Sequence, residues 1–171
     1  MFKLVTYPSD ILKMSSSRVE NFDKSLRDLI DGMVEMMYEK HGVGLAAPQL
    51  GFHKRIVVMD ASAGDDKNDL TIMINPIIKW KSKEIEILEE GCLSLPGVII
   101  RVPRHNSVEI EYQDVFGETH YALYNGWSAR VIQHEIDHLE GTLMLDKAGP
   151  LERRMALKNV DKMAVSVTED V

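Results

Sequence analysis

Two histidines four residues apart, His134 and His138, follow the pattern H-E-x-x-H. Residues four apart lie on the same face of an α-helix, so both imidazole rings can reach one metal ion. Glu135 stands at the edge of that face, where it can take a proton from a water molecule without binding the metal. The pattern predicts metal-assisted hydrolysis. Because the pattern is short, two unrelated surface histidines beside a glutamate are the alternative interpretation.

A catalytic metal site usually has three protein ligands and one exchangeable position, so the two histidines need a partner. Downstream, Glu140 points about 100° or more away from them on a helix, and Asp146 lies beyond the expected end of that helix. Upstream, Cys92 offers a thiolate directly after Gly91, where the backbone can approach closely. We expect Cys92 to complete the ligand set, and Asp146 is the alternative that the spacing leaves open.

The helix that carries the motif also carries Trp127 and Val131 on the side of the histidines. Two histidines and a glutamate buried without partners would cost several kcal/mol, so a buried helix of this kind also favours a metal. We expect Asp137 to lie outside the ligand set, either as an outer partner of the site or in an ion pair, for which Arg130 is the candidate partner.

The periodicity of the apolar residues predicts the elements that position these side chains. A helix should begin at an Asn21 cap and end at Gly42, and the motif helix and a more polar C-terminal helix should cover 127–140 and 150–164. Breaks are expected at 63–66 and at Asn75-Pro76. Period-two segments predict five strands, at 55–60, 70–78, 84–88, 108–112 and 118–124.

This order of elements predicts an α+β fold. Largely antiparallel β-sheets should pack around a buried central helix carrying H-E-x-x-H, with an N-terminal and a C-terminal helix added. A length of 171 residues with 44% hydrophobic and 27% charged residues is typical of one globular domain, here 1–171.

Composition also excludes several partners and compartments. A net charge of −7 argues against a direct nucleic-acid reader, and no apolar run approaches the ~20 residues that cross a bilayer. The N-terminal segment has no signal-peptide character, and one cysteine forms no internal disulfide. We therefore expect a cytoplasmic protein with no membrane contact. A lone cysteine can also be a small buried core residue, which is the alternative for Cys92.

Three motifs together resemble those of the peptide deformylase family: GVGLAAPQ at 42–49, EGCLS at 90–94 and QHEIDH at 133–138. They occur in the order and at the spacings of that family, and the resemblance covers nearly the whole chain. It implies a metal-dependent hydrolase that removes the N-formyl group from the N-terminal formylmethionine of nascent polypeptides and releases formate.

The resemblance also implies roles for individual residues. Glu135 would move the proton, and the Gln49 side chain and the Leu93 N–H would bind the oxyanion. The metal ligands would be Cys92, His134 and His138, and the substrate would lie against Val43, Gly44, Gly91, Trp127 and Val131.

One divalent ion per chain is implied. The resemblance favours Fe²⁺, whereas ligand affinity favours Zn²⁺, and Ni²⁺ or Co²⁺ are further alternatives. We expect a monomer. The cations of the last helix, Arg153, Arg154, Lys158 and Lys162, form either a solvated face or a weak ribosome contact.

Three other interpretations each fit only part of the sequence. G-x-G-x-x-A at 42–47 fits a dinucleotide fingerprint, but it follows a helix and runs into Pro48, so its context is wrong. A zincin-type peptidase would keep the histidines but leave Cys92 without a role. A non-catalytic binding module would not need Glu135.

Overall fold

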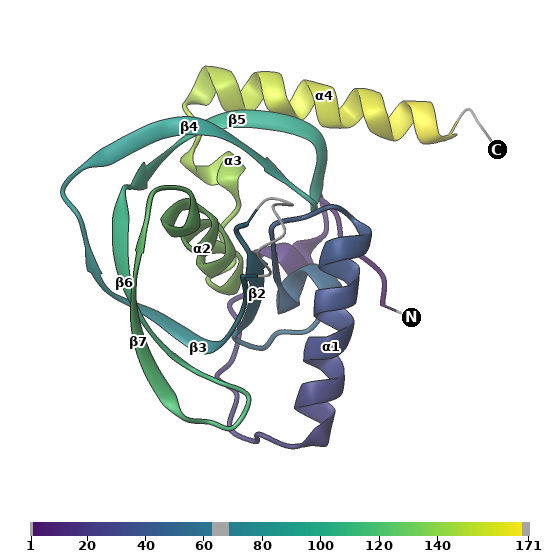
Figure 1. Ribbon diagram of the computed structural model, residues 1–171. Helices are drawn as coiled ribbons and strands as arrows, with labels where there is room; N and C mark the ends of the chain where they lie inside the picture. The colour runs from purple at the N-terminus through teal and green to yellow at the C-terminus, as the bar shows by residue number, and fades with distance from the viewer. Residues whose placement is uncertain (1, 63–68, 169–171) are drawn as a thin grey trace.

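In the part of the chain that the structure describes, two antiparallel sheets and four α-helices make up the fold (Figure 1). The computed structural model describes the backbone of residues 2–62 and 69–168, and the side chains of this set up to residue 160. The break expected at 63–66 and the side chain of Lys162 lie outside that description. The predicted combination of helices with antiparallel sheet is confirmed. In the described part of the chain, no helix combines the length and apolarity that a membrane crossing requires.

Helix α1 covers Lys24–Glu39 and starts two residues later than the predicted Asn21 cap allows. Asp23 is the cap, because its carboxylate accepts a hydrogen bond of 3.0 Å from the N–H of Leu26, three residues on. The helix ends before Gly42: His41 takes a left-handed conformation with φ 55°, and the Gly42 N–H donates back into the last turn. The chain is thereby turned from α1 into the first strand.

The larger sheet has five strands in the order β1-β2-β3-β6-β7, and all neighbours are antiparallel. Asn75-Pro76 does not end β3 as predicted, because the strand continues through a register shift between Ile74 and Ile77. Asn75 sits there with φ 54°, held by hydrogen bonds between its side chain and the backbone of Val19. The strands are β1 (Gly44–Ala46), β2 (Ile56–Asp60), β3 (Leu70–Lys81), β6 (Ser107–Gln113) and β7 (Thr119–Asn125).

The smaller sheet is a two-stranded ribbon of β4 (Ile85–Cys92) and β5 (Leu95–His105). Neither β5 nor the short β1 was predicted. One face of β5 is buried against the helices α3 (Met144–Lys147) and α4 (Pro150–Thr168). The free edge of β5 is covered by α4, where Glu152 accepts a hydrogen bond of 2.9 Å from the Arg101 N–H.

Helix α2 (Gly126–Leu139) lies between the ribbon and the larger sheet and contacts strands of both (Figure 1). The residues of its sheet-facing side, Ala129, Ile132, Ile136 and Leu139, are buried with Val57, Met73 and Ile110. Its other side faces the ribbon and the short 3-10 helix η2 (Ala47–Leu50). A second 3-10 helix, η1 (Asp10–Lys13), lies in the N-terminal segment before α1.

Candidate active site

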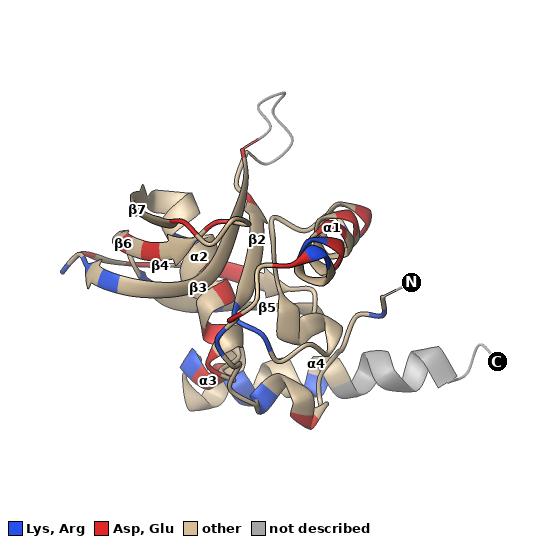
Figure 2. Cartoon of the chain, turned by 90° about the horizontal axis from the view of Figure 1, so that it is seen from below, with Lys and Arg blue, Asp and Glu red and all other residues tan. Residues whose placement is uncertain are grey.

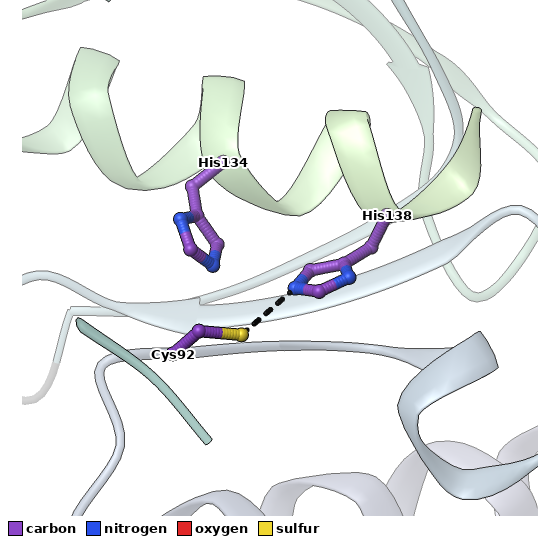
Figure 3. Close-up of side chains that lie close together, drawn as sticks. All are labelled: Cys92, His134 and His138. Atoms are coloured by element: carbon purple, nitrogen blue, oxygen red, sulfur yellow. Dashed lines mark hydrogen bonds between the residues drawn. The ribbon is translucent and has the colours of Figure 1, made fainter. Parts of the chain in front are cut away.

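The donor atoms of Cys92, His134 and His138 come together although they belong to two elements. Cys92 ends β4, and the histidines lie one turn apart on α2. The ligand atoms of the three residues lie within 4.8 Å of one another, and Cys92 Sγ is 3.2 Å from His138 Nε2. Both rings are directed toward the sulfur (Figure 3). One sulfur and two nitrogens around a common point form a suitable donor set for a divalent transition metal.

The electrostatics of the three donors also fit a metal ion. Burial lowers the pKa of His138 well below its ordinary range, so this ring is neutral. Burial acts in the same direction on His134, but Cys92 and Glu90 raise the pKa of that ring well above its ordinary range. The His138 Nδ1 and Glu135 Oε2 atoms are buried and have no hydrogen-bond partner among the described residues. A metal binds the neutral form of an imidazole and the thiolate form of a cysteine, so its binding releases any proton that these donors carry.

Glu90 is the outer partner of His134 and was not predicted as a functional residue. Its Oε2 lies 2.9 Å from His134 Nδ1, so the Nε2 of that ring is left for the metal. Arg104 donates to both carboxylate oxygens, at 2.8 and 2.9 Å. Burial alone would raise the pKa of Glu90, but these bonds lower it to about 2. Two facts could have identified Glu90 from the sequence. It lies two residues before Cys92, and histidines that bind a metal usually pair with a carboxylate.

The predicted ion pair between Asp137 and Arg130 is wrong. Seven residues on a helix separate the two by about 10 Å along the axis, which is too far for a direct bond. Asp137 instead bonds to Arg104 from β5 and lies 3.2 Å from Lys147 Nζ. Arg130 donates to Glu90 at 2.8 Å. Both pairs reach across to other elements, so spacing within α2 could not reveal them.

Glu135 lies beside the donor cluster with 4% of its surface exposed. Burial is the largest cause that raises its pKa, to about 7. A methyl group at Gly44 would stand 2.5 Å from its Oε1, so a larger residue at that position of β1 would displace the carboxylate. A neutral-range pKa and an unpaired oxygen are the properties of a group that exchanges protons.

Gln49 from η2 faces the same cluster and is 1% exposed. Its Oε1 accepts a hydrogen bond of 2.8 Å from the Ala46 N–H, which fixes the orientation of the amide. The Nε2 group is thereby turned toward Cys92 Sγ at 3.7 Å and Ser94 Oγ at 3.2 Å. The side chain therefore presents an N–H donor in a fixed direction.

A cavity of about 620 Å³ opens next to these groups. Trp127 was expected on a buried side of α2, but its side chain is 46% exposed because it lies in the first turn and forms part of the cavity wall. His134, Glu135 and Gln49 line the cavity too. The other predicted substrate residues that line it are Val43, Gly44, Gly91 and Val131, together with Leu93.

The two downstream carboxylates considered as third ligands lie elsewhere. Asp146 accepts from the Leu143 N–H at 2.9 Å and pairs with Arg153. Glu140 pairs with Arg55 at 2.7 Å. Within the described ranges 2–62 and 69–160, Cys92 alone joins the two histidines in a cluster of metal-binding groups.

Sequence and structure comparisons agree on one family. A sequence model of the polypeptide deformylase family matches residues 1–154. The peptide deformylase of Orientia tsutsugamushi (strain Ikeda) is 41% identical over 172 residues, which cover 95% of each chain. The crystal structure of a peptide deformylase from Legionella pneumophila superposes with a TM-score of 0.92 at 38% identity and 98% coverage of both chains. The crystal structure of Plasmodium falciparum peptide deformylase superposes with a TM-score of 0.90, also at 38% identity and 98% coverage of both chains.

Proposed function

Because this chain belongs to the peptide deformylase family, enzymes that remove the N-formyl group from nascent peptides, we propose that Cys92, His134 and His138 bind its catalytic metal. The observation that carries the assignment is the approach of their three donor atoms beside a buried glutamate without a hydrogen-bond partner for its Oε2. A zincin-type peptidase would leave Cys92 without a role at this position. When bound, a divalent ion polarises the formyl oxygen and lowers the pKa of water to about 7.

Glu135 is the group that we assign to proton transfer. Its carboxylate takes a proton from the attacking water and returns it to the departing amine nitrogen, and formate leaves. A pKa raised to about 7 by burial suits both halves of this task near neutral pH. Gly44 keeps the space in which the carboxylate can move.

Gln49 and Leu93 are assigned to the oxyanion. The tetrahedral species carries negative charge on the former formyl oxygen, and the Gln49 Nε2–H and Leu93 N–H donate hydrogen bonds to it. Because Ala46 already holds the Gln49 amide, little reorganisation is needed. A preorganised donor of this kind contributes about 3 kcal/mol to transition-state stabilisation.

The substrate is proposed to lie in the cavity of about 620 Å³. Its backbone pairs with the chain at Val43, Gly44 and Gly91, where the two glycines permit close approach. Its methionine side chain contacts Trp127 and Val131, which supply apolar surface one to two turns before His134.

Formate release from a formyl-Met peptide tests the assignment. Glu135→Gln should lower kcat by about 10²–10⁴-fold while metal binding persists, because the proton acceptor alone is lost. Cys92→Ala should lose both metal and activity. Glu140→Gln is the matched control, since it changes an exposed carboxylate at the end of the same helix. Peptide-bond cleavage without formate, or metal binding without turnover in the unsubstituted protein, would contradict the proposal.

We propose Fe²⁺ as the physiological ion, with one ion per chain. Sulfur and imidazole donors accept Fe²⁺ and Zn²⁺ alike, and affinity order alone favours Zn²⁺. Anaerobic purification should give iron and high activity that decays in air. Full activity that is stable in air with stoichiometric zinc would count against iron.

We further propose a weak ribosome contact through α4. Basic residues gather on the described part of this helix, whereas α1 is rich in acidic residues (Figure 2). Arg154 and Lys158 are exposed there. Their replacement by glutamate should reduce co-sedimentation with ribosomes without loss of formate release from free peptides. Unchanged pelleting would exclude the contact.

The working unit is proposed to be one catalytic domain, 1–171, acting as a monomer in the cytoplasm. Sedimentation at micromolar concentration should give the mass of one chain. A dimeric mass would contradict this part.

A further inference from the structure

Arg130 is a buried arginine of α2 that the catalytic assignment does not use. Its side chain is 3% exposed and lies on the wall of the cavity. The guanidinium donates to Glu90 Oε1 at 2.8 Å, to the Val102 carbonyl at 2.8 Å and to the Glu86 carbonyl at 2.7 Å. One side chain therefore joins α2 to both strands of the β4–β5 ribbon.

This connection matters because the three donor atoms are divided between the same two elements. Cys92 belongs to the ribbon, and His134 and His138 belong to α2. Among the described residues, neither strand of the ribbon pairs with the larger sheet, and most of β4 is exposed. Side-chain bonds between the ribbon and α2 therefore help to set the distance between the thiol and the imidazoles.

Glu90 is held from both elements at once. Arg104, on the ribbon itself, donates to both carboxylate oxygens. Arg130 reaches Oε1 from α2, and His134 Nδ1 meets Oε2. The bond from Arg130 sets where the carboxylate stands relative to the helix, and the bond to Oε2 sets the tautomer and rotation of the His134 ring.

We propose that Arg130 is a positioning residue for the metal site: through Glu90 and the two ribbon carbonyls it holds His134 in register with Cys92. The proposal rests on the assignment of Cys92, His134 and His138 as ligands. It concerns metal affinity, whereas deformylation is tested separately by formate release from the unsubstituted enzyme.

Two substitutions and a matched control test it. Arg130→Met keeps an unbranched apolar stem and removes all three bonds. Arg130→Lys keeps the positive charge beside Glu90 but cannot reach three acceptors with the same planar geometry. Arg55→Met is the control, because Arg55 also bonds one carboxylate and one carbonyl, those of Glu140 and Pro76, away from the donor cluster.

The readout is the dissociation constant for Zn²⁺ alone, measured by competition with a chromophoric chelator on variants whose far-ultraviolet circular dichroism matches the unsubstituted protein. We expect Arg130→Met to weaken Zn²⁺ binding by about 10–100-fold, the usual effect of losing an outer partner of a ligand. The dissociation constant of Arg130→Lys should lie between those of Arg130→Met and the unsubstituted protein. That of Arg55→Met should stay within about twofold of the unsubstituted protein.

At saturating Zn²⁺, kcat for the formyl-Met peptide should fall more than KM rises in both Arg130 variants, because the site is displaced and the cavity is retained. Unchanged Zn²⁺ affinity in a folded Arg130 variant would overturn the proposal, and Arg130→Lys alone decides if Arg130→Met does not fold. A loss of Zn²⁺ affinity in Arg55→Met equal to that in Arg130→Met would overturn it as well.

Discussion

Glu90 lies between Arg104, Arg130 and His134 with 5% of its surface exposed. Burial opposes its charge, but hydrogen bonds from Arg104 and His134 lower its pKa from 4.5 to about 2. At a pH between about 2 and 4.5, the folded state therefore binds fewer protons than the unfolded chain. The stabilisation, about 3 kcal/mol, is complete above pH 4.5 and is lost as the pH falls toward 2.

Glu90→Gln should lower the free energy of unfolding by about 3–5 kcal/mol at pH 7, because the buried Arg130 loses its counter-charge and the buried Arg104 keeps only Asp137. The substitution should also make the free energy of unfolding depend less on pH between about 4.5 and 2. Urea unfolding from pH 7 down to pH 2 measures both effects, and Glu89→Gln, an exposed neighbour on β4, is the control. Equal acid sensitivity of the Glu90 variant and the unsubstituted protein would contradict the assigned pKa.

Gly44→Ala tests the space in front of Glu135, the proposed proton-transfer group. The added methyl would stand 2.5 Å from Glu135 Oε1, and 3.0 Å from its Cδ and Cγ, so the carboxylate must move. A displacement of about 1 Å at a reacting group lowers rates by about 10²-fold, and we expect kcat to fall by at least this factor while the metal stays bound. Gly149→Ala, with no atom within 4 Å of the new methyl, should leave kcat unchanged. A kcat within threefold of normal in Gly44→Ala would show that Glu135 tolerates displacement.

At the scale of elements, one hydrogen bond joins the end of α1 to the end of β2. Tyr38 Oη donates to Asp60 Oδ2 at 2.7 Å, and the Asp60 N–H donates to the Val43 carbonyl at 2.9 Å. The turn that leads into Gly44 is thereby fixed at both ends. The bond to Asp60 is also the largest cause that raises the pKa of Tyr38, to about 12.

Asp60→Asn should return the pKa of Tyr38 toward 10, measured by the ultraviolet absorbance of tyrosinate during alkaline titration. Because the pKa of Tyr38 is raised in the folded state, its bond to Asp60 stabilises the fold fully below pH 10. This stabilisation is lost as the pH rises toward 12. Burial also raises the pKa of Tyr124, so two tyrosines contribute to the absorbance change at high pH. The Tyr38→Phe variant is therefore needed to identify the part of the titration curve that belongs to Tyr38. Identical titration curves with and without Asp60 would sink this assignment.

The elements that the sequence predicted are those with a regular period along the chain. Both long helices near the site and five strands follow from apolar spacing, and the H-E-x-x-H spacing on one helix predicted how His134 and His138 lie. Strand β5 was missed because Pro96, Gly97 and Pro103 resemble breaks. Those residues are tolerated since β5 pairs with a strand on one side only. The bonds among Glu90, Arg104 and Arg130 join three elements, so no spacing within one element could predict them.

For the whole molecule, the donor cluster lies where two separately hydrogen-bonded parts meet. The five-stranded sheet carries α2 on its face, and the ribbon lies on the other side of that helix (Figure 1). Cys92 comes from the ribbon and the histidines from the helix. A metal ion bound at this proposed site would therefore add a link between the two parts, in addition to supplying chemistry.

Metal removal should destabilise the protein mainly at the ribbon. A ligand present at 100 times its dissociation constant stabilises the folded state by about 2.7 kcal/mol, so chelation should lower the free energy of unfolding by at least this amount. Hydrogen exchange should then accelerate along β4 and β5, while β2 and β3, paired with two neighbours each, keep their protection. The Cys92→Ala variant should show this faster exchange along β4 and β5 whether or not Zn²⁺ is added. Uniform acceleration over both sheets would mean that the metal stabilises the fold globally and that the ribbon has no separate dependence on it.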